Sequence, residues 1–218
     1  VEAHKPSIEK HHYEGAFKFS RIPIKAMITL PNDKELLVYV CHLKSNRNNE
    51  FEYVFNESHT LAHKKELVGK ALEYKNSASL KQRLCEASSL FHDIKQYKKQ
   101  PTVLLCDLND KEFSITIDAL SNPQYYEDTS KSDFVLHDAS YHYKQEVYNP
   151  HPEAKEPKRK ATSYFLGKGN VLDYIFISND LREKVTNYTV LDEHLQENKD
   201  GSLLQSDHAQ VVCELSSW

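Results

Sequence analysis

Apolar residues gather in short runs that polar segments separate, a pattern typical of β-strands. The runs occupy residues 22–30, 35–42, 102–106, 171–178 and 209–215. Apolar runs of about four to eight residues bounded by turn-forming residues predict strands, and a continuous run such as 36–41 predicts burial on both faces. Between the first two runs, Pro31-Asn32-Asp33-Lys34 has the composition of a turn, so we predict a tight antiparallel hairpin there.

The stretch from Ser58 to about Tyr97 carries its apolar residues at helical spacing instead. Intervals of three and four residues, with charged residues between them, predict amphipathic helix. The apolar positions are Leu61, Leu67, Val68, Leu72, Leu80, Leu84, Ala87, Leu90, Phe91 and Ile94. Asn76-Ser77 interrupts this pattern, which allows two helices in place of one.

The remaining segments are polar and predict short or irregular structure. A short helix fits residues 111–120, a turn or short helix fits 181–185, and loops fit 1–18, 46–56, 121–160 and 192–205. The order strand, strand, long helix, strand, strand, strand implies antiparallel hairpins as well as a helical crossover. We therefore predict a single domain over residues 1–218 of the α/β (α+β mixed) class, built as a two-sheet α/β sandwich.

Composition narrows the function classes only a little. The formal net charge of −4 provides no global basic field, so a nucleic-acid partner would have to bind local basic patches. No run approaches the roughly 18 apolar residues needed to cross a bilayer, and the N-terminus has no apolar signal core, so we expect no membrane partner. The four cysteines form no C-x-x-C pair and fit buried thiols, which favours the cytoplasm without establishing it.

Polar side chains suited to metal or proton chemistry follow or interrupt the predicted strands at four places. These are His42 with Lys44, Asp107 with Asn109, Asp173 alone, and Asp207 with His208. Residues two apart in extended backbone point to one side, so Asp107 and Asn109 could together ligate Mg²⁺ or orient a water. A histidine beside a carboxylate suits a general base, because its pKa lies near neutrality. Asp173 lies in a strongly apolar run and needs a partner, for which a histidine is the natural choice.

Each of these placements also has a plain structural explanation. The D-x-N sequence is common in Asx turns, His42 could be bonded to backbone at a strand end, and Asp207-His208 could belong to a surface turn. Taken together and in this order, they indicate one polar site at the open end of a sheet. Carboxylates, an amide and two histidines suit a hard divalent cation that works on phosphate.

The candidate residues lie in five short motifs, namely Phe19-Ser20-Arg21-Ile22-Pro23, Val40-Cys41-His42-Leu43-Lys44-Ser45, Leu105-Cys106-Asp107-Leu108-Asn109, Leu172-Asp173-Tyr174-Ile175 and Ser206-Asp207-His208-Ala209. Read as a set, these motifs resemble those of the endonuclease/exonuclease/phosphatase superfamily. That superfamily includes pancreatic-type deoxyribonucleases, AP endonucleases, sphingomyelinases and inositol polyphosphate phosphatases. Cys106 stands where the family carries glycine in its G-D-x-N motif.

The resemblance implies a role for each candidate residue. Asp107 and Asn109 would hold the attacking water and the phosphate, and they would ligate the metal together with Asp207. His208 would be the general base or would stabilise the transition state, and Asp173 would orient a catalytic histidine. His42 would contact the phosphate or protonate the leaving oxygen, while Arg21 and Lys44 would bind the substrate. The implied cofactor is Mg²⁺, with Mn²⁺ or Ca²⁺ as alternatives.

The sequence departs from the family in its first part. The family's Asn-bearing strand and its Gln-Glu strand end, whose Glu is the principal metal ligand, have no counterpart before Arg21. We therefore expect the C-terminal part of a catalytic domain that lacks the N-terminal strands, with an exposed sheet face through which another segment or chain could associate.

The predicted function is Mg²⁺-dependent phosphodiester hydrolysis, by a nuclease that acts on DNA. A phosphatase or lipid phosphodiesterase of the same superfamily and a truncated non-catalytic domain are the alternatives. The basic stretch 155–160 could grip nucleic acid or form a solvated loop. Nearby tyrosines could stack on bases or pack the loop, namely Tyr125, Tyr126, Tyr141, Tyr143 and Tyr148.

Overall fold

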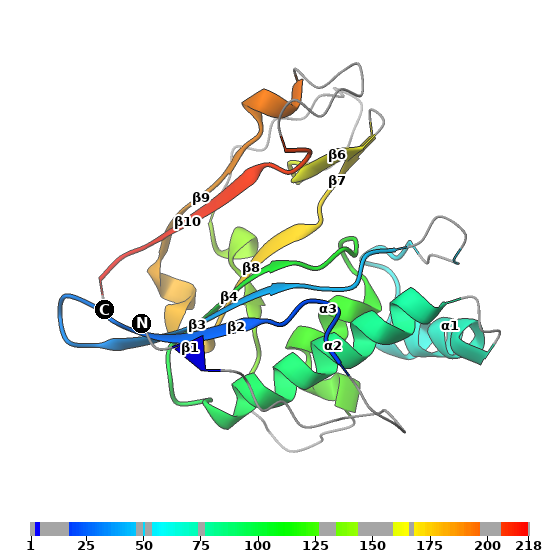
Figure 1. The fold of residues 1–218 in the computed structure, drawn as a ribbon, viewed down its shortest axis with the longest axis horizontal. Coiled ribbons are helices and arrows are strands. Elements are labelled where there is room, and N and C mark those ends of the chain that lie inside the picture. The colour runs from blue at the N-terminus through cyan, green and yellow to red at the C-terminus, as the bar shows by residue number, and fades with distance from the viewer. Residues whose placement is uncertain are drawn as a thin grey trace.

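A mixed six-stranded sheet with helices on one face forms the body of the structure (Figure 1), which is a computed structural model. The structure describes residues 3–4, 18–46, 50, 54–73, 77–126, 134–143, 159–165, 168–196 and 206–217. Two further two-stranded sheets accompany the main one. The predicted mixed α/β class is therefore confirmed.

The main sheet has the strand order β1-β2-β3-β4-β8-β5. Its strands are β1 Ala3–His4, β2 Ile24–Thr29, β3 Glu35–His42, β4 Thr102–Asp107, β8 Asp173–Ile177 and β5 His137–Asp138. Strands β2 and β3 form the predicted antiparallel hairpin, β4 runs parallel to β3, and β8 runs antiparallel to β4. Because β1 pairs with β2, the prediction of a loop over residues 1–18 is wrong at Ala3–His4. Residues 5–17 lie outside the described part.

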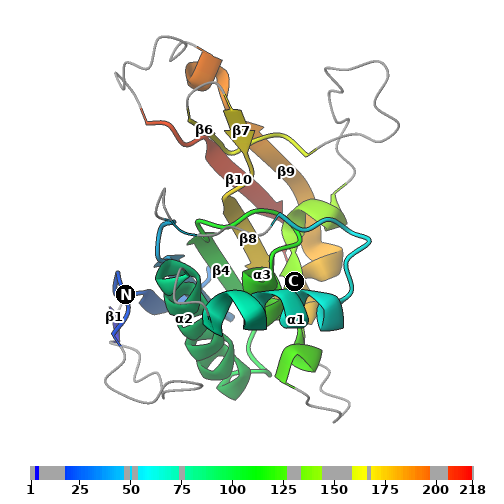
Figure 2. The same ribbon diagram turned by 90° about the vertical axis from the view of Figure 1, so that its right-hand side faces the viewer.

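Three helices cover one face of this sheet, as Figures 1 and 2 show. They are α1 Leu61–Glu73, α2 Ala78–Gln96 and α3 Ile115–Ser121. The first two replace the predicted long helix: α1 ends at Glu73 and α2 begins at Ala78, so the pattern's allowance for two helices is confirmed. Leu90, Phe91 and Ile94 of α2 are fully or almost fully buried in one core with Tyr39 of β3 and Leu104 of β4. The helical periodicity of the sequence therefore reflects burial against the sheet.

The opposite face of the sheet carries a smaller apolar core. Strands β9 Val185–Leu191 and β10 Gln210–Leu215 form an antiparallel pair there, and β6 Ser163–Phe165 pairs with β7 Lys168–Asn170. Tyr188 and Val190 of β9 share this core with Ile175 and Ile177 of β8. Strand β10 was predicted, whereas β6, β7 and β9 were not.

Strand β3 is not buried on both faces, so that prediction is wrong. Leu37, Tyr39 and Cys41 face the helices and are buried, whereas Val40 on the other side is 40% exposed. Ile24, which pairs with Val40, is 53% exposed. The apolar residues of β9 and β10 pack mainly over β4 and β8, so among the described residues this part of the sheet has little cover. Within the described residues this part of the sheet face is therefore exposed, and association of another segment or chain with it stays a prediction.

In the described part of the basic and tyrosine-rich region, several side chains pack against the rest of the protein. The Arg159 side chain is buried against Asp138 and does not fit a solvated basic loop, whereas Lys160 forms an ion pair with Asp192 but is 47% exposed. Tyr125 and Tyr126 pack against the helical core, which favours packing over base stacking for these two. Tyr143 packs against the smaller core and Tyr141 is 66% exposed, while Tyr148 and residues 155–158 lie outside the described part.

Candidate active site

Three predicted site residues lie in a row across adjacent strands of the main sheet. His42 of β3 is the register partner of Asp107 of β4, and Asp107 is the register partner of Asp173 of β8. Paired residues on neighbouring strands point to the same face, so the strand register itself brings these three side chains together. The row lies on the face opposite the helices, since Tyr174 beside Asp173 belongs to the helical core.

His208 joins this row from a distant part of the chain. It forms a β-bridge with Ser163, and the Asp207 carbonyl accepts a hydrogen bond from the Tyr164 amide. Its Nδ1 lies 2.8 Å from Asp173 Oδ2. We refer to His42, Asp107, Asp173 and His208 together as the polar row.

The hydrogen bond between Asp173 and His208 determines which ring nitrogen of His208 can accept a proton. This bond raises the pKa of His208 above its ordinary value, and burial opposes the shift. With Nδ1–H donating to the carboxylate, Nε2 becomes the proton-accepting nitrogen of the neutral ring. A carboxylate that holds the tautomer and stabilises the imidazolium is the arrangement that general bases use in hydrolases.

His42 and Asp107 form the second close pair. His42 Nε2 lies 3.2 Å from Asp107 Oδ2. Burial lowers the pKa of His42, only partly offset by Asp107, and nearby Arg21 lowers it further. Burial also raises the pKa of Asp107, and repulsion from Asp173 adds to that shift while the Asn109 amide opposes it. His42 is therefore mainly neutral at pH 7, and it contacts its neighbours as a hydrogen-bonding ring.

Asp107 and Asn109 form the Asx turn that was the plain structural explanation of this motif. The Asn109 amide donates to Asp107 Oδ1 at 2.8 Å, and Asn109 adopts a positive φ of 50°, a region in which Asn is favoured. The Asn109 side chain donates from Nδ2 to the Leu43 carbonyl at 3.1 Å. The turn thus ends β4 and also ties it to the segment after β3, beside the polar row.

Arg21 lies on the same side of the molecule as the polar row. Its guanidinium donates to the Leu43 carbonyl at 3.0 Å and to Ser45 Oγ at 3.3 Å, and it lies close enough to His42 to lower the pKa of that ring. Lys44 belongs to the same segment as Leu43. These placements fit the predicted substrate-binding roles of Arg21 and Lys44, which stay predictions.

Asp107, Asp173 and His208 each offer one ligand atom, and these atoms lie within 4.8 Å of one another. Mg²⁺ is usually held by one or two carboxylates and several waters, so Asp107 fits it, and a cation there would relieve the repulsion between Asp107 and Asp173. His208 Nδ1 is already bonded to Asp173, so the imidazole fits a base better than a ligand. Asp207 is not in this group, and metal roles for Asn109 and Asp207 stay predictions.

Sequence reasoning missed two residues that hold the polar row. Thr162 is fully buried, and its Oγ1 accepts hydrogen bonds from the amides of Leu172 and Asp173 at 2.9 and 3.0 Å. The Nε2 atom of His194 lies 3.1 Å from the His208 carbonyl oxygen. Neither residue belongs to a motif or a periodic pattern, so the sequence gives no signal for either.

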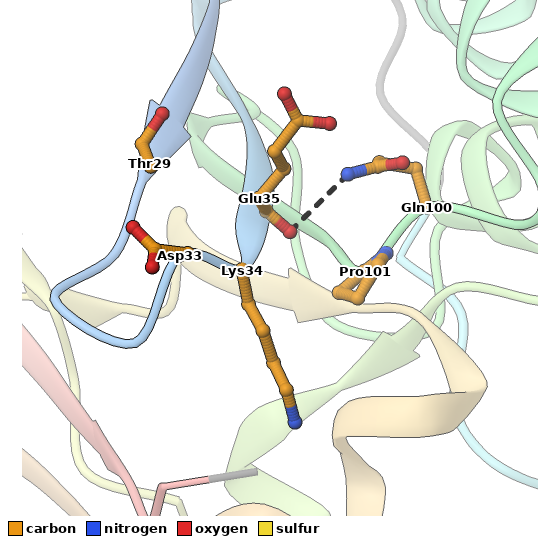
Figure 3. Close-up of a pocket in the computed structure, with 6 residues that line it drawn as sticks. All are labelled: Thr29, Asp33, Lys34, Glu35, Gln100 and Pro101. Carbon is orange, nitrogen blue, oxygen red and sulfur yellow. Dashed lines mark hydrogen bonds between the residues drawn. The ribbon is translucent and has the colours of Figure 1, made fainter.

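A surface hollow that involves Thr29, Asp33, Lys34, Glu35, Gln100 and Pro101 lies away from the polar row (Figure 3). It lies at the turn between β2 and β3, where Gln100 Nε2 donates to the Glu35 carbonyl at 3.2 Å. Glu35 and His42 are the two ends of β3, and eight residues of strand span roughly 25 Å. The hollow is therefore not part of the candidate site.

The Asp173–His208 bond predicts a pH-dependent contribution to stability that can be measured without metal or substrate. A raised histidine pKa in the folded state adds stability that is fully present below the unfolded pKa and is lost as pH rises through the folded pKa. Asp173→Asn should therefore lower the free energy of unfolding more near pH 5.5 than near pH 8.5. NMR titration of the His208 ring in chelator should also show a lower pKa in this variant, and an unchanged pKa would contradict the hydrogen bond.

Comparisons with known proteins give similarity at the level of structure only. No protein-family model matches the chain, and no curated protein sequence matches it. The human Nocturnin catalytic domain is 16% identical, with a TM-score of 0.46 over 89% of this chain and 52% of that one. An endonuclease/exonuclease/phosphatase family protein from Bacteroides thetaiotaomicron is 16% identical, with a TM-score of 0.47 over 92% and 58%. An AP endonuclease from Archaeoglobus fulgidus is 15% identical, with a TM-score of 0.49 over 96% and 72%.

The superfamily that the motifs indicate is thus represented among the similar solved structures. The chain spans between half and three fifths of the length of the first two of them. Among the described helices, none combines the length and apolar character that a membrane span requires.

Proposed function

We propose that this chain supplies the base and much of the phosphate-binding side of a divalent-metal-dependent phosphoester hydrolase. The polar row carries this proposal, because it places a carboxylate-bonded histidine beside a second carboxylate and a second histidine. A metal that held Asp107 would supply positive charge to the phosphate oxygens.

The geometry supports a distinct task for each member of the polar row. His208 Nε2 takes the proton of the attacking water, and Asp173 stabilises the imidazolium that forms. Asp107 and Asn109, held in their turn, orient that water and the phosphate. The lowered pKa of His42 favours hydrogen bonding to a phosphate oxygen over proton donation to the leaving group. Arg21 neutralises charge that builds on the phosphate.

The proposed substrate is a phosphodiester in DNA. Support comes from the Phe19–Pro23 motif and from the position of Arg21 beside His42. Arg159 is buried in its ion pair with Asp138, so it adds nothing to nucleic-acid binding, whereas Lys160 is paired with Asp192 but keeps an exposed side chain. A phosphate monoester or a phospholipid headgroup offers the same anionic oxygens and is the second candidate.

A substrate panel tests the proposed function in the full natural protein that carries this chain. Plasmid DNA, an inositol polyphosphate and sphingomyelin should be incubated with Mg²⁺ and, in parallel, with excess chelator. We expect nicking of the plasmid in Mg²⁺ and its loss in chelator. Hydrolysis of another substrate alone would replace DNA with that substrate. Absence of all hydrolysis would overturn the enzymatic proposal in favour of a non-catalytic domain.

A further inference from the structure

Glu86 of α2 is a carboxylate with no exposed surface that bonds to two loop amides. Its Oε1 accepts from the Ser20 amide at 2.6 Å and from Gln82 Nε2 at 3.0 Å, and its Oε2 accepts from the Lys44 amide at 2.7 Å. An ionised carboxylate is costly to bury unless hydrogen bonds satisfy it, and bonds to an ionised acceptor are among the strongest in proteins. Both oxygens of Glu86 are used in this way.

The two amides belong to the two segments that carry the predicted phosphate-binding residues. Ser20 directly precedes Arg21, and the other amide is that of Lys44 itself. The backbone carbonyl of Lys44 accepts a hydrogen bond from Arg83 Nη1 at 3.1 Å. Glu86 and Arg83, one helical turn apart, therefore hold both backbone polar groups of Lys44.

The same set of polar contacts extends to the turn at the end of β4. Arg83 Nε donates to Asp110 Oδ2 at 3.3 Å, in a pair whose side chains are 2% and 6% exposed. The Leu43 carbonyl accepts from both Arg21 and Asn109. Segments 20–21, 43–45 and 109–110 are thus bonded to one another and anchored on one stretch of α2.

We propose that Glu86 is a positioning residue that fixes Arg21 and Lys44 around a bound phosphate group. The inference rests on the proposed function, and it adds the residue that holds the segments of Arg21 and Lys44 in place. The hydrogen bonds of Glu86 go to Gln82 and to the amides of Ser20 and Lys44, not to the polar row, so it would act on binding through the backbone of the two segments. The ligand class is the anionic oxygens shared by phosphodiesters, phosphomonoesters and inorganic phosphate.

Asp93 provides a matched control on the same helix. It lies seven residues after Glu86, about two turns along the same face, and is 4% exposed. Its Oδ2 accepts from Lys25 Nζ at 2.8 Å and from Tyr39 Oη at 2.5 Å, in the body of the sheet. Asp93→Asn therefore perturbs an equally buried carboxylate without touching the segments of Arg21 and Lys44.

The test compares Glu86→Gln with Asp93→Asn in the full natural protein, by titration with inorganic phosphate and by substrate kinetics. An amide offers only one acceptor oxygen, so Glu86→Gln should leave one loop amide unsatisfied. We expect phosphate affinity to fall about tenfold and KM to rise in proportion, with kcat changed much less. Hydrogen exchange of the Ser20 and Lys44 amides should accelerate. Asp93→Asn should leave phosphate affinity and KM at the wild-type values.

Each outcome decides the proposal. Faster exchange at Ser20 and Lys44 with unchanged phosphate affinity and KM would overturn it, because Glu86 would then be merely structural. If Glu86→Gln fails to fold, Gln82→Met removes one donor to Glu86 from a partly exposed position and should weaken phosphate binding less but in the same direction. Wild-type protein that binds phosphate without hydrolysing any ester would overturn the proposed function alone.

Discussion

Replacing His208 with alanine is expected to lower kcat by about 10²- to 10⁴-fold, the range typical of a lost general base. The reason is the 2.8 Å bond from its Nδ1 to Asp173, which presents Nε2 as the proton acceptor. The measurement is hydrolysis of the substrate that the panel identifies, in Mg²⁺, with the full natural protein. Circular dichroism should show that the variant remains folded.

A histidine at the other end of β8 supplies the control for this prediction. His142 packs against the ring of His137, and His137 pairs with Ile177, at the end of β8 opposite Asp173. His142→Ala should therefore keep the wild-type rate. Equal rates for His208→Ala and wild type would remove His208 from the catalytic machinery.

Replacing Arg159 with alanine should lower the free energy of unfolding by about 3–5 kcal/mol, the usual cost of breaking a buried ion pair. Arg159 lies 2.5 Å from Asp138, and the two side chains are only 8% and 9% exposed. The guanidinium also donates to Tyr188 Oη at 2.8 Å and lies 4.9 Å from the ring centroid of Tyr174. Its removal leaves Asp138 of β5 buried without this cation. Urea denaturation measures the loss.

An exposed ion pair gives the comparison for Arg159. Lys70 and Glu66 are spaced i,i+4 on α1 at 2.7 Å, but their side chains are 59% and 61% exposed. Lys70→Ala should leave the free energy of unfolding nearly unchanged, because water and salt screen such exposed pairs. Similar losses for the two variants would show that the Arg159 pair is not buried in solution.

The local pattern of apolar and polar residues was enough to predict most of the strands and helices that position the site. The run Glu35–His42 matches β3 at both ends, because an apolar stretch stops where polar residues begin. Strand β9 was missed because Val185-Thr-Asn-Tyr-Thr-Val-Leu191 mixes polar and apolar residues without a continuous run. The exposure of Val40 could not be predicted either, because a strand's sequence does not reveal what covers it.

The members of the polar row were found from their motifs, but their contacts depend on strand register. Asp107 meets both His42 and Asp173 only because three strands pair in one register, which arises from long-range packing. Glu86 and Thr162 were overlooked for another reason. Their side chains bond to backbone amides of distant segments, and no motif or periodic pattern in the sequence indicates such bonds.

The most direct test of the central claim is a double-mutant cycle between Asp173 and His208. Rates of hydrolysis in Mg²⁺ would be measured for Asp173→Asn, His208→Ala and the double variant, because residues that act as one unit give strongly non-additive effects. If Asp173 acts through His208, the double variant should be no slower than His208→Ala alone. Losses that multiply would contradict the account, since the two residues would then contribute independently to the reaction.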